Sequence, residues 1–465
     1  MAKKTNKNSR GSVSSPRSDV EAQRQAIADE FERIYDKEVL KQLVDMLHHR
    51  LRSRKLPPWL MRVVMLHWVL GGVQTLRVMA MALRIGLVKG GPRRDFSDQA
   101  FNKRLRQLPP ELAQTLLDDT TRRLTANTPI DPLIQALAPF ASGIYAVDDT
   151  TLDKVNKKSR LLQRIFEDEV VLAGRLGSLI DLGTGLWRQL VYDPDPNANE
   201  KNHIRPLLRS AGAGAMLVFD LGYFCFPLFD DLTESLMYFV TRMRNKTTYI
   251  TRHVWAESSV YRDRIITLGK YRADRAAHPV RLVELFVRGK WRRYITNVLD
   301  PRILPASSVW GLYEKRWTIE MCFQAVKQAL GLNRFVASSP NSILSQIWAT
   351  LTVYQLLQAM RVQVAAKRRM NRDNISWTRL LQMIKIYTML PQSPGPLLPW
   401  LSKNAHELRK VGKRKRRAKA LPPKVIQAVR RYGEIESEPP PEALASQPPR
   451  QGKPQPRLRP SPLVH

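Results

Sequence analysis

The sequence predicts an α/β fold in which a mixed sheet lies between two helical regions. Three observations carry this prediction. Residues 26–140 show a helical pattern throughout, short apolar runs that end in acidic residues begin at Gly143, and helical periodicity returns over residues 338–401. A chain of 465 residues is long enough for two to four domains and a sizeable core.

The chain carries a large positive charge. It has 76 Lys and Arg residues against 41 Asp and Glu residues, a formal net charge of +35 that is spread over most of the length. Such a field favours nucleic acid, whose phosphates exchange bound counterions for Lys and Arg. An anionic membrane surface is the competing partner. The most apolar stretch, residues 56–83, is interrupted by charged residues and glycines and predicts a buried helix, so we expect no membrane association.

Several other classes of protein are disfavoured by what the sequence lacks. The amino terminus has no apolar region of a signal peptide. Cys225 and Cys322 are too few for a disulfide framework or a structural zinc site. There is no GxxxxGK[ST] motif, so we expect no use of a nucleoside triphosphate. These features lead us to expect a cytoplasmic protein, located where the DNA is.

The predicted elements divide the chain into six parts. They are a disordered basic N-terminus (1–25), a helical domain (26–140), an α/β core in two pieces (141–224 and 310–337), a β-rich insertion (225–309), a second helical region (338–401) and a basic, Pro-rich tail (402–465). In the first helical domain, residues 97–124 fit either a helix–turn–helix that reads DNA ends or plain helical packing.

The core segments follow one another in a recognisable order. GIYAVDD (143–149) predicts a buried strand, and two further runs form a hairpin around the glycines at 183 and 185. A helix follows despite Pro206, and AMLVFDLGYF (215–224) supplies the next apolar strand. Three strands, a helix and a fourth strand are the opening order of a ribonuclease-H-like sheet.

The stretch YEKRWTIEMCFQAVKQALGL (313–332) predicts a helix with two distinct stripes. At 100° per residue, four polar residues fall within about 60° of arc; they are Tyr313, Arg316, Glu320 and Lys327. The neighbouring stripe is apolar and is expected to face the core; it holds Ile319, Phe323, Val326 and Leu330. The polar stripe suits a metal and a phosphate, although a salt-bridged border on an ordinary amphipathic helix gives the same pattern.

Acidic residues at two strand ends match Glu320 in kind. Asp148, or its neighbour Asp149, ends the first strand, and Asp220 ends the fourth. Strand ends of an α/β sheet are where ligands gather, and three converging carboxylates repel one another unless a cation neutralises them. With no His or Cys cluster nearby, Mg²⁺ or Mn²⁺ is the expected ion. Two such ions, about 3.5–4 Å apart, would serve phosphodiester displacement.

Basic residues in the 313–332 stretch and in the insertion are candidates for contacts with DNA. Arg316 and Lys327 are placed for phosphates that flank the metal site. Arg242, Arg244 and Lys246 would form a basic rib on the insertion, or else simply a solvated strand edge. Taken singly, each aspartate also fits a turn residue after a strand.

These residues resemble a known family. The spacing Tyr313–x2–Arg316–x3–Glu320–x6–Lys327 resembles the Tyr-Arg-Glu-Lys (YREK) signature of bacterial insertion-sequence transposases with an Asp-Asp-Glu (DDE) triad. AVDDTTL (146–152) and FDLGYF (219–224) look like the first and second catalytic-acid motifs of that group, in the right order. The likeness covers roughly residues 60–360. The first motif of the family usually has Gly after its Asp. Asp149 stands there instead, so Asp148 and Asp149 compete, and the spacing AVD-x-TTL favours Asp148.

The resemblance implies cut-and-paste DNA transposition on a ribonuclease-H-like, retroviral-integrase-like catalytic core with a β insertion. It implies two Mg²⁺ (or Mn²⁺) ions on Asp148, Asp220 and Glu320, with Tyr313, Arg316 and Lys327 engaging the DNA end. It also implies terminal inverted repeats and target DNA as partners, a homodimer in the synaptic complex, and a bacterial, nucleoid-associated protein. Two rival functions remain: a structure-specific nuclease on the same core, and a catalytically inactive DNA-binding relative.

Overall fold

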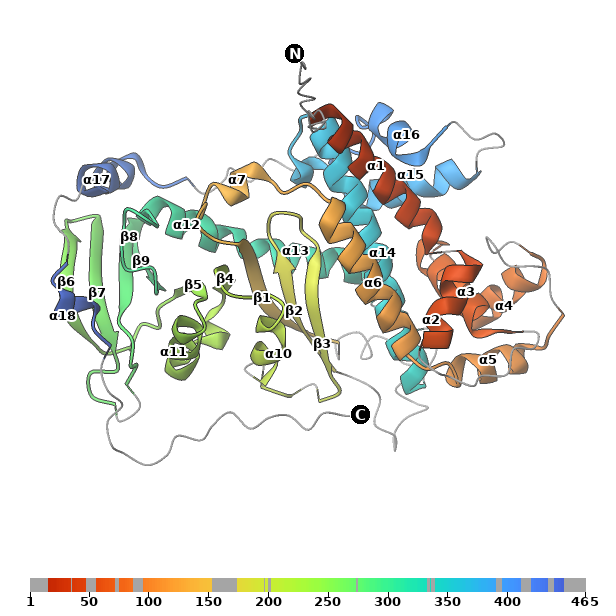
Figure 1. Cartoon of the computed structure of the whole chain (residues 1–465), viewed down its shortest axis with the longest axis horizontal. Helices are drawn as coiled ribbons and strands as arrows, with labels where there is room; N and C mark the ends of the chain where they lie inside the picture. Colours follow the sequence, from red (N-terminus) through yellow and green to blue (C-terminus); the bar gives the residue numbers. More distant parts are fainter. Residues whose placement is uncertain are drawn as a thin grey trace, which may run out of the picture.

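The computed structural model describes residues 16–34, 36–46, 56–71, 75–86, 95–152, 174–195, 197–199, 202–272, 275–332, 335, 339–389, 395–410, 420–433 and 439–446. One long sheet continues into a group of packed helices, which lie to the right in Figure 1. The mixed α/β fold that the sequence predicts is therefore confirmed.

The first helical region contains seven helices within the described residues. They are α1 (Pro16–Arg33), α2 (Lys37–Met46), α3 (Pro58–Gly71), α4 (Leu76–Arg84), α5 (Asp98–Arg106), α6 (Glu111–Asn127) and α7 (Pro132–Gln135). Residues 16–25, which we expected to be disordered, belong to α1. This helix is held by buried Ile27 and Phe31 farther along and begins at Pro16, a residue favoured at the first helical position. Residues 1–15 lie outside the described part.

The sheet has nine strands in the order β3-β2-β1-β4-β5-β9-β8-β7-β6. The first four are β1 (Gly143–Thr151), β2 (Arg175–Asp181), β3 (Trp187–Asp193) and β4 (Ala215–Phe219), with α10 (Ile204–Leu208) before β4. β2 and β3 form the predicted hairpin, in which Gly185 has a φ of +74°. β1 pairs with β2 in the antiparallel sense and with β4 in parallel. The predicted order of three strands, a helix and a fourth strand is therefore present.

The segment 225–309 does not form a separate body. It contains α11 (Phe226–Glu234), β5 (Tyr238–Arg242), β6 (Tyr249–Glu257), β7 (Tyr261–Leu268), β8 (Val280–Val287) and β9 (Lys290–Thr296). β5 pairs in parallel with β4, and β9 then pairs with β5, so the strands extend the sheet that β1 begins. The predicted boundary after residue 224 cuts through this sheet, because the short apolar strand β5 lies beyond it.

The two faces of β1 bury different cores. Ile144 and Ala146 join the larger core, which includes residues of α13 (Trp317–Gln324) and α14 (Pro340–Lys367). Tyr145 and Val147 join a smaller core with residues of α10 and α11. Successive side chains of a strand point to opposite faces, so the odd and even positions of β1 pack against different helices.

Residues 313–332, which the sequence predicts as one helix, are divided among three helical segments. These are the end of α12 (Ala306–Lys315), α13, and η3 (Ala325–Ala329), a π-helical turn. At the first division, the amide of Arg316 donates to Tyr313 and that of Ile319 donates to Arg316, both across three residues. These tighter bonds replace α-helical ones there. The predicted apolar stripe nevertheless reaches the core, because all four of its residues are buried: Ile319, Phe323, Val326 and Leu330.

The C-terminal helices complete the packing. α14 packs against α6, α3, α1 and α5, so the two predicted helical regions form one body. After α14 come η4 (Arg372–Asn374), α15 (Trp377–Met389), α16 (Leu397–Lys403), α17 (Pro423–Gly433) and α18 (Pro441–Leu444). The last two helices belong to the segment predicted as a basic, Pro-rich tail (402–465), and they lie at the far end of the sheet, beside β6 and β7 (Figure 1). The basic run KRKRR (413–417) lies outside the described residues.

Among the described residues, no single helix is long and apolar enough to cross a bilayer. Only α3 and α4 taken together reach the required length and composition, and they are bent by 116°. Nearly all of α3 is buried, as the sequence predicted.

Candidate active site

β1 separates the two competing aspartates. Asp148 lies on the even face with Ile144 and Ala146, and its Oδ2 lies 3.7 Å from a guanidinium nitrogen of Arg316. Asp149 lies on the odd face, where its carboxylate is fully buried and contacts His203 and Arg175. Only Asp148 therefore lies on the face that α13 covers.

Asp220 follows β4 directly and lies beside Asp148. The parallel register pairs Val147 with Phe219, so the next residue on each strand is an aspartate. One carboxylate oxygen of Asp220 accepts a hydrogen bond from the amide of Leu221 at 2.7 Å, and the same oxygen accepts one from the Tyr313 hydroxyl at 3.2 Å. α12 thus places Tyr313 against the second predicted acid.

Arg316 links the acids on the strands to Glu320 of α13. Its Nη2 donates to Glu320 Oε1 at 2.7 Å, while Nη1 forms the ion pair with Asp148. Burial lowers the pKa of Arg316, but Asp220, Tyr313 and Glu320 outweigh it and raise that pKa overall. The guanidinium therefore acts as a cation among Asp148, Asp220 and Glu320. We call these three residues the acidic edge.

The surroundings of Asp148 disfavour its ionisation. Burial is the main cause that raises its pKa to about 6, and the negative charges of Glu320 and Asp220 add to it. The amide of Asp149, which donates to Asp148 Oδ1 at 2.8 Å, and the charge of Arg316 oppose the shift. The three carboxylates are thus close enough to affect one another electrostatically.

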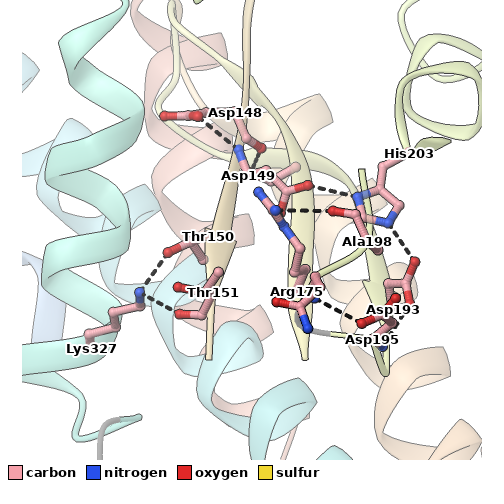
Figure 2. A network of polar contacts seen from close by, with 12 residues as sticks. Asp148, Asp149, Thr150, Thr151, Arg175, Asp193, Asp195, Ala198, His203 and Lys327 are labelled. Atoms are coloured by element: carbon pink, nitrogen blue, oxygen red, sulfur yellow. Dashed lines mark hydrogen bonds and ion pairs between the residues drawn. The ribbon is translucent and has the colours of Figure 1, made fainter. Parts of the chain in front are cut away.

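The remaining predicted residues lie on the same side. Lys327, in η3, donates to Thr150 Oγ1 at 2.6 Å and to the carbonyl of Thr151 at 3.0 Å (Figure 2). Arg242, the last residue of β5, is half-buried, and its charge lowers the pKa of Tyr313, which burial and Asp220 raise to about 12. The structure therefore brings all of the predicted site residues except Asp149 to one side of the sheet.

The acidic edge fits a divalent ion by the chemistry of its donors but not by their spacing. Its donors are carboxylate oxygens that surround one positive group, and such hard donors suit Mg²⁺ or Mn²⁺. Within the described residues, however, no group of three or more Asp, Glu, His or Cys side chains is spaced to hold a metal ion. The donor chemistry fits, and Arg316 supplies the positive charge in the arrangement that the structure shows.

A second polar network was missed by the sequence reasoning. His203 Nδ1 lies 2.7 Å from Asp149 Oδ2, and its Nε2 lies 2.8 Å from Asp193 Oδ2 (Figure 2). Burial lowers the pKa of His203, but hydrogen bonds to both aspartates outweigh it and raise the pKa overall. The apolar residues next to His203 in α10 gave no signal for this role, because the network depends on strand pairing.

Comparison with known proteins identifies one segment of the chain. Residues 173–356 match the transposase DDE domain family. The match contains Asp220 and Glu320 and ends within α14, whereas Asp148 precedes it. The transposase DDE domain implies a ribonuclease-H-like fold, in agreement with the order of β1 to β5.

Three bacterial transposases are similar to this chain. A putative transposase of Sinorhizobium fredii is 26% identical over 226 residues, which are 44% of this chain and 62% of the relative. A probable transposase for an insertion sequence element of Geobacillus stearothermophilus is 25% identical over 36% of this chain and 45% of its own length. A transposase for insertion sequence element IS4 of Escherichia coli is 24% identical over 31% of this chain and 34% of its own length. The chain thus spans less than two thirds of each relative.

Proposed function

We propose that this chain is a transposase of a bacterial insertion sequence. It would cleave phosphodiester bonds at terminal inverted repeats and join the released ends to target DNA, in cut-and-paste transposition. One observation carries the proposal: Asp220 and Glu320 lie within the segment that matches the transposase DDE domain, and the charge of Arg316 faces both of them and Asp148.

Asp148, Asp220 and Glu320 would hold the divalent ions, two Mg²⁺ or Mn²⁺ per site. When bound, such ions activate a water or a DNA 3′-hydroxyl and stabilise the leaving oxygen. Tyr313 orients the Asp220 carboxylate by its hydrogen bond. Because no three acids in the described part of the chain are spaced for an ion, we expect the acidic edge to rearrange when it takes up metal.

Basic residues around the acidic edge would bind the DNA end. Arg316 has donors in a planar fork that matches a phosphate bidentately, and Lys327 offers a point charge at the end of β1. Arg242 lies near enough to Tyr313 for its charge to lower the pKa of that hydroxyl. The Tyr-Arg-Glu-Lys spacing supports placement in the YREK group, and the net charge of +35 supports a long DNA contact.

The rest of the assignment follows from the same proposal. We propose that β6 to β9 are the insertion of the catalytic core, because they follow β5 and precede the helix that carries Glu320. A homodimer would bring two DNA ends together in a synaptic complex. The protein would act in the bacterial cytoplasm on the nucleoid, without a nucleoside triphosphate and without a membrane.

A catalytically inactive DNA-binding relative is the second candidate. The ion pairs of Arg316 with Asp148 and Glu320 favour it, because they satisfy these acids without a metal. Stabilisation of the protein by millimolar Mn²⁺ that is lost in Asp220→Asn would count against this candidate.

The test is DNA cleavage by the purified full chain. With DNA that carries the ends of its own element, we expect cleavage and joined products only when Mg²⁺ or Mn²⁺ is present. Glu320→Gln should abolish cleavage and retain DNA binding, whereas the exposed Glu234→Gln serves as a matched control and should behave as wild type. Cleavage without joined products would indicate a structure-specific nuclease. Full activity of Glu320→Gln would remove Glu320 from the mechanism.

A further inference from the structure

The polar network behind β1 contains four charged groups that balance one another. Asp149 lies between His203 and Arg175, whose Nε is 3.5 Å from Asp149 Oδ1, and Asp193 lies beyond His203. Carboxylates only accept hydrogen bonds, so both ring nitrogens of His203 donate. Two negative and two positive groups then form a neutral set, which is what a fully buried carboxylate such as that of Asp149 requires.

The pairing of β1 with β2 makes room for this network. Asp149 faces Gly177 across the ladder. A Cβ atom at position 177 would lie 2.9 Å from Cβ of His203 and 3.3 Å from its Nδ1. Only glycine at this position leaves space for the His203 ring beneath β1.

The network also connects β1 to the β2–β3 hairpin and to the segment that leads to α10. Asp193 ends β3, and its second oxygen accepts a hydrogen bond from the amide of Asp195. Arg175 of β2 donates to the carbonyl of Ala198, in the segment that leads to α10. His203 therefore ties β1 to the β2–β3 hairpin and to the start of α10.

This connection fixes which residues of β1 lie on the face of the sheet that α13 covers. A slip of one residue in a strand moves every side chain to the opposite face. With Asp149 held on the odd face, Asp148 and Thr150 are held on the even face, next to Arg316 and Lys327. The carbonyl of Asp148 also accepts a hydrogen bond from Ser178 at 3.0 Å, which supports the same register.

We propose that four residues form a positioning network that holds Asp148 toward Asp220 and Glu320, where the divalent ions and DNA would bind; they are Asp149, His203, Asp193 and Arg175. The inference rests on the proposed function, because it assigns the network to the site that performs it. His203 is its central positioning residue. Groups that orient metal ligands in this way typically change metal affinity or activity about 10- to 100-fold when they are removed.

The primary test compares His203→Gln with wild type in the full chain. A Gln amide donates to one carboxylate and presents an oxygen to the other, so it cannot bridge both. We expect a cleavage rate, or an apparent Mn²⁺ affinity, that is lower by about 10- to 100-fold, with metal-free DNA affinity unchanged. In the metal-free protein, amide hydrogen exchange should accelerate over residues 144–152 and stay unchanged elsewhere.

Two further variants keep the test decisive. Asp193→Ala removes the half-buried far anchor and should act in the same direction even if His203→Gln does not fold. Arg205→Ala is the control. It removes an exposed ion pair between Arg205 of α10 and Asp231, and it should match wild type in every measurement.

The possible outcomes separate this inference from the proposed function. Wild-type cleavage, Mn²⁺ affinity and exchange over 144–152 in either network variant would overturn the positioning role alone. Faster exchange throughout the protein, with parallel losses of DNA binding and cleavage, would likewise overturn it in favour of general stabilisation. A wild-type chain that shows no metal-dependent cleavage would overturn both.

Discussion

Asp148 and Asp149 are adjacent residues whose carboxylates have opposite surroundings. Asp148 shares one cation, Arg316, with two other acids, and its pKa is raised to about 6. Asp149 contacts two cationic groups, His203 and Arg175. Ionisation of Asp148 is therefore opposed by its environment, whereas the carboxylate of Asp149 lies against two cationic groups.

Because of these surroundings, replacing each aspartate by a neutral residue is expected to change the free energy of unfolding in opposite directions. The pKa of Asp148 is higher in the folded protein than in the unfolded chain, so the folded state binds the extra proton. The stability that this proton contributes is complete below about pH 4 and is lost as pH rises through about 6. In metal-free protein at pH 8, Asp148→Asn should thus raise the free energy of unfolding by on the order of 2 kcal/mol, with little effect near pH 4.

Asp149→Asn is the matched control for this prediction. It leaves His203 and Arg175 facing a neutral amide, and we expect it to lower the free energy of unfolding at pH 8. Urea denaturation at several pH values in the presence of a chelator measures both effects. A change of the same sign in the two variants at pH 8 would contradict the division of roles across β1.

At the scale of elements, α17 shows how a segment of the tail belongs to the fold. It packs against β7, β8 and α12, the helix that ends near Tyr313. Its inward face is apolar at helical spacing, with buried Val425 followed by Ala428, Val429 and Tyr432. Docking of α17 therefore supports the far end of the sheet.

Truncation of the inward face should release this helix. We expect Val425→Ala to lower the stability of α17 docking by about 1–3 kcal/mol, because a buried side chain loses its contacts. Ile426→Ala, at an exposed neighbouring position, should change it by less than about 0.5 kcal/mol. Amide hydrogen exchange over residues 423–433 measures the difference. Equal protection in both variants would mean that α17 does not depend on this face.

The same elements show what the sequence could predict. The β2–β3 hairpin, β4 and the apolar stripe through Ile319 and Phe323 follow from local periodicity, and the structure contains them. The spacing in α17 carried the same kind of signal, but the Pro-rich and basic residues around it concealed the helix. The division of 313–332 at Arg316 depends on tertiary contacts, which periodicity does not encode.

Prediction of the candidate site from the sequence has a similar limit. The sequence identified Asp148, Asp220, Glu320 and Arg316 from motif spacing, and the structure places them together. It left Asp148 and Asp149 in competition, because only the pairing of β1 with its neighbours reveals which face each one occupies. His203 was missed for the same reason: its partners Asp149 and Asp193 are 54 and 10 residues away.

At the scale of the whole molecule, one sheet connects the parts that the proposed function requires. β1 and β4 carry two acids, α13 brings the third, and β5 to β9 continue the sheet from the same edge toward α17. From the N-terminal region α1, α3, α5 and α6 pack on α14, and from the C-terminal region α15 and α16 do so. A net charge of +35 gives this assembly a strong attraction for DNA phosphates.

Asp148 of β1, Asp220 just after β4 and Glu320 of α13 are proposed to bind the same divalent ions. Calorimetric titration of the metal-free protein with Mn²⁺ tests this proposal most directly, with Asp148→Asn, Asp220→Asn and Glu320→Gln compared against wild type. We predict that wild type binds Mn²⁺ and that each substitution alone weakens this binding by at least about tenfold, since all three carboxylates share the ions. Wild-type Mn²⁺ affinity in any one of the three variants would contradict a shared site.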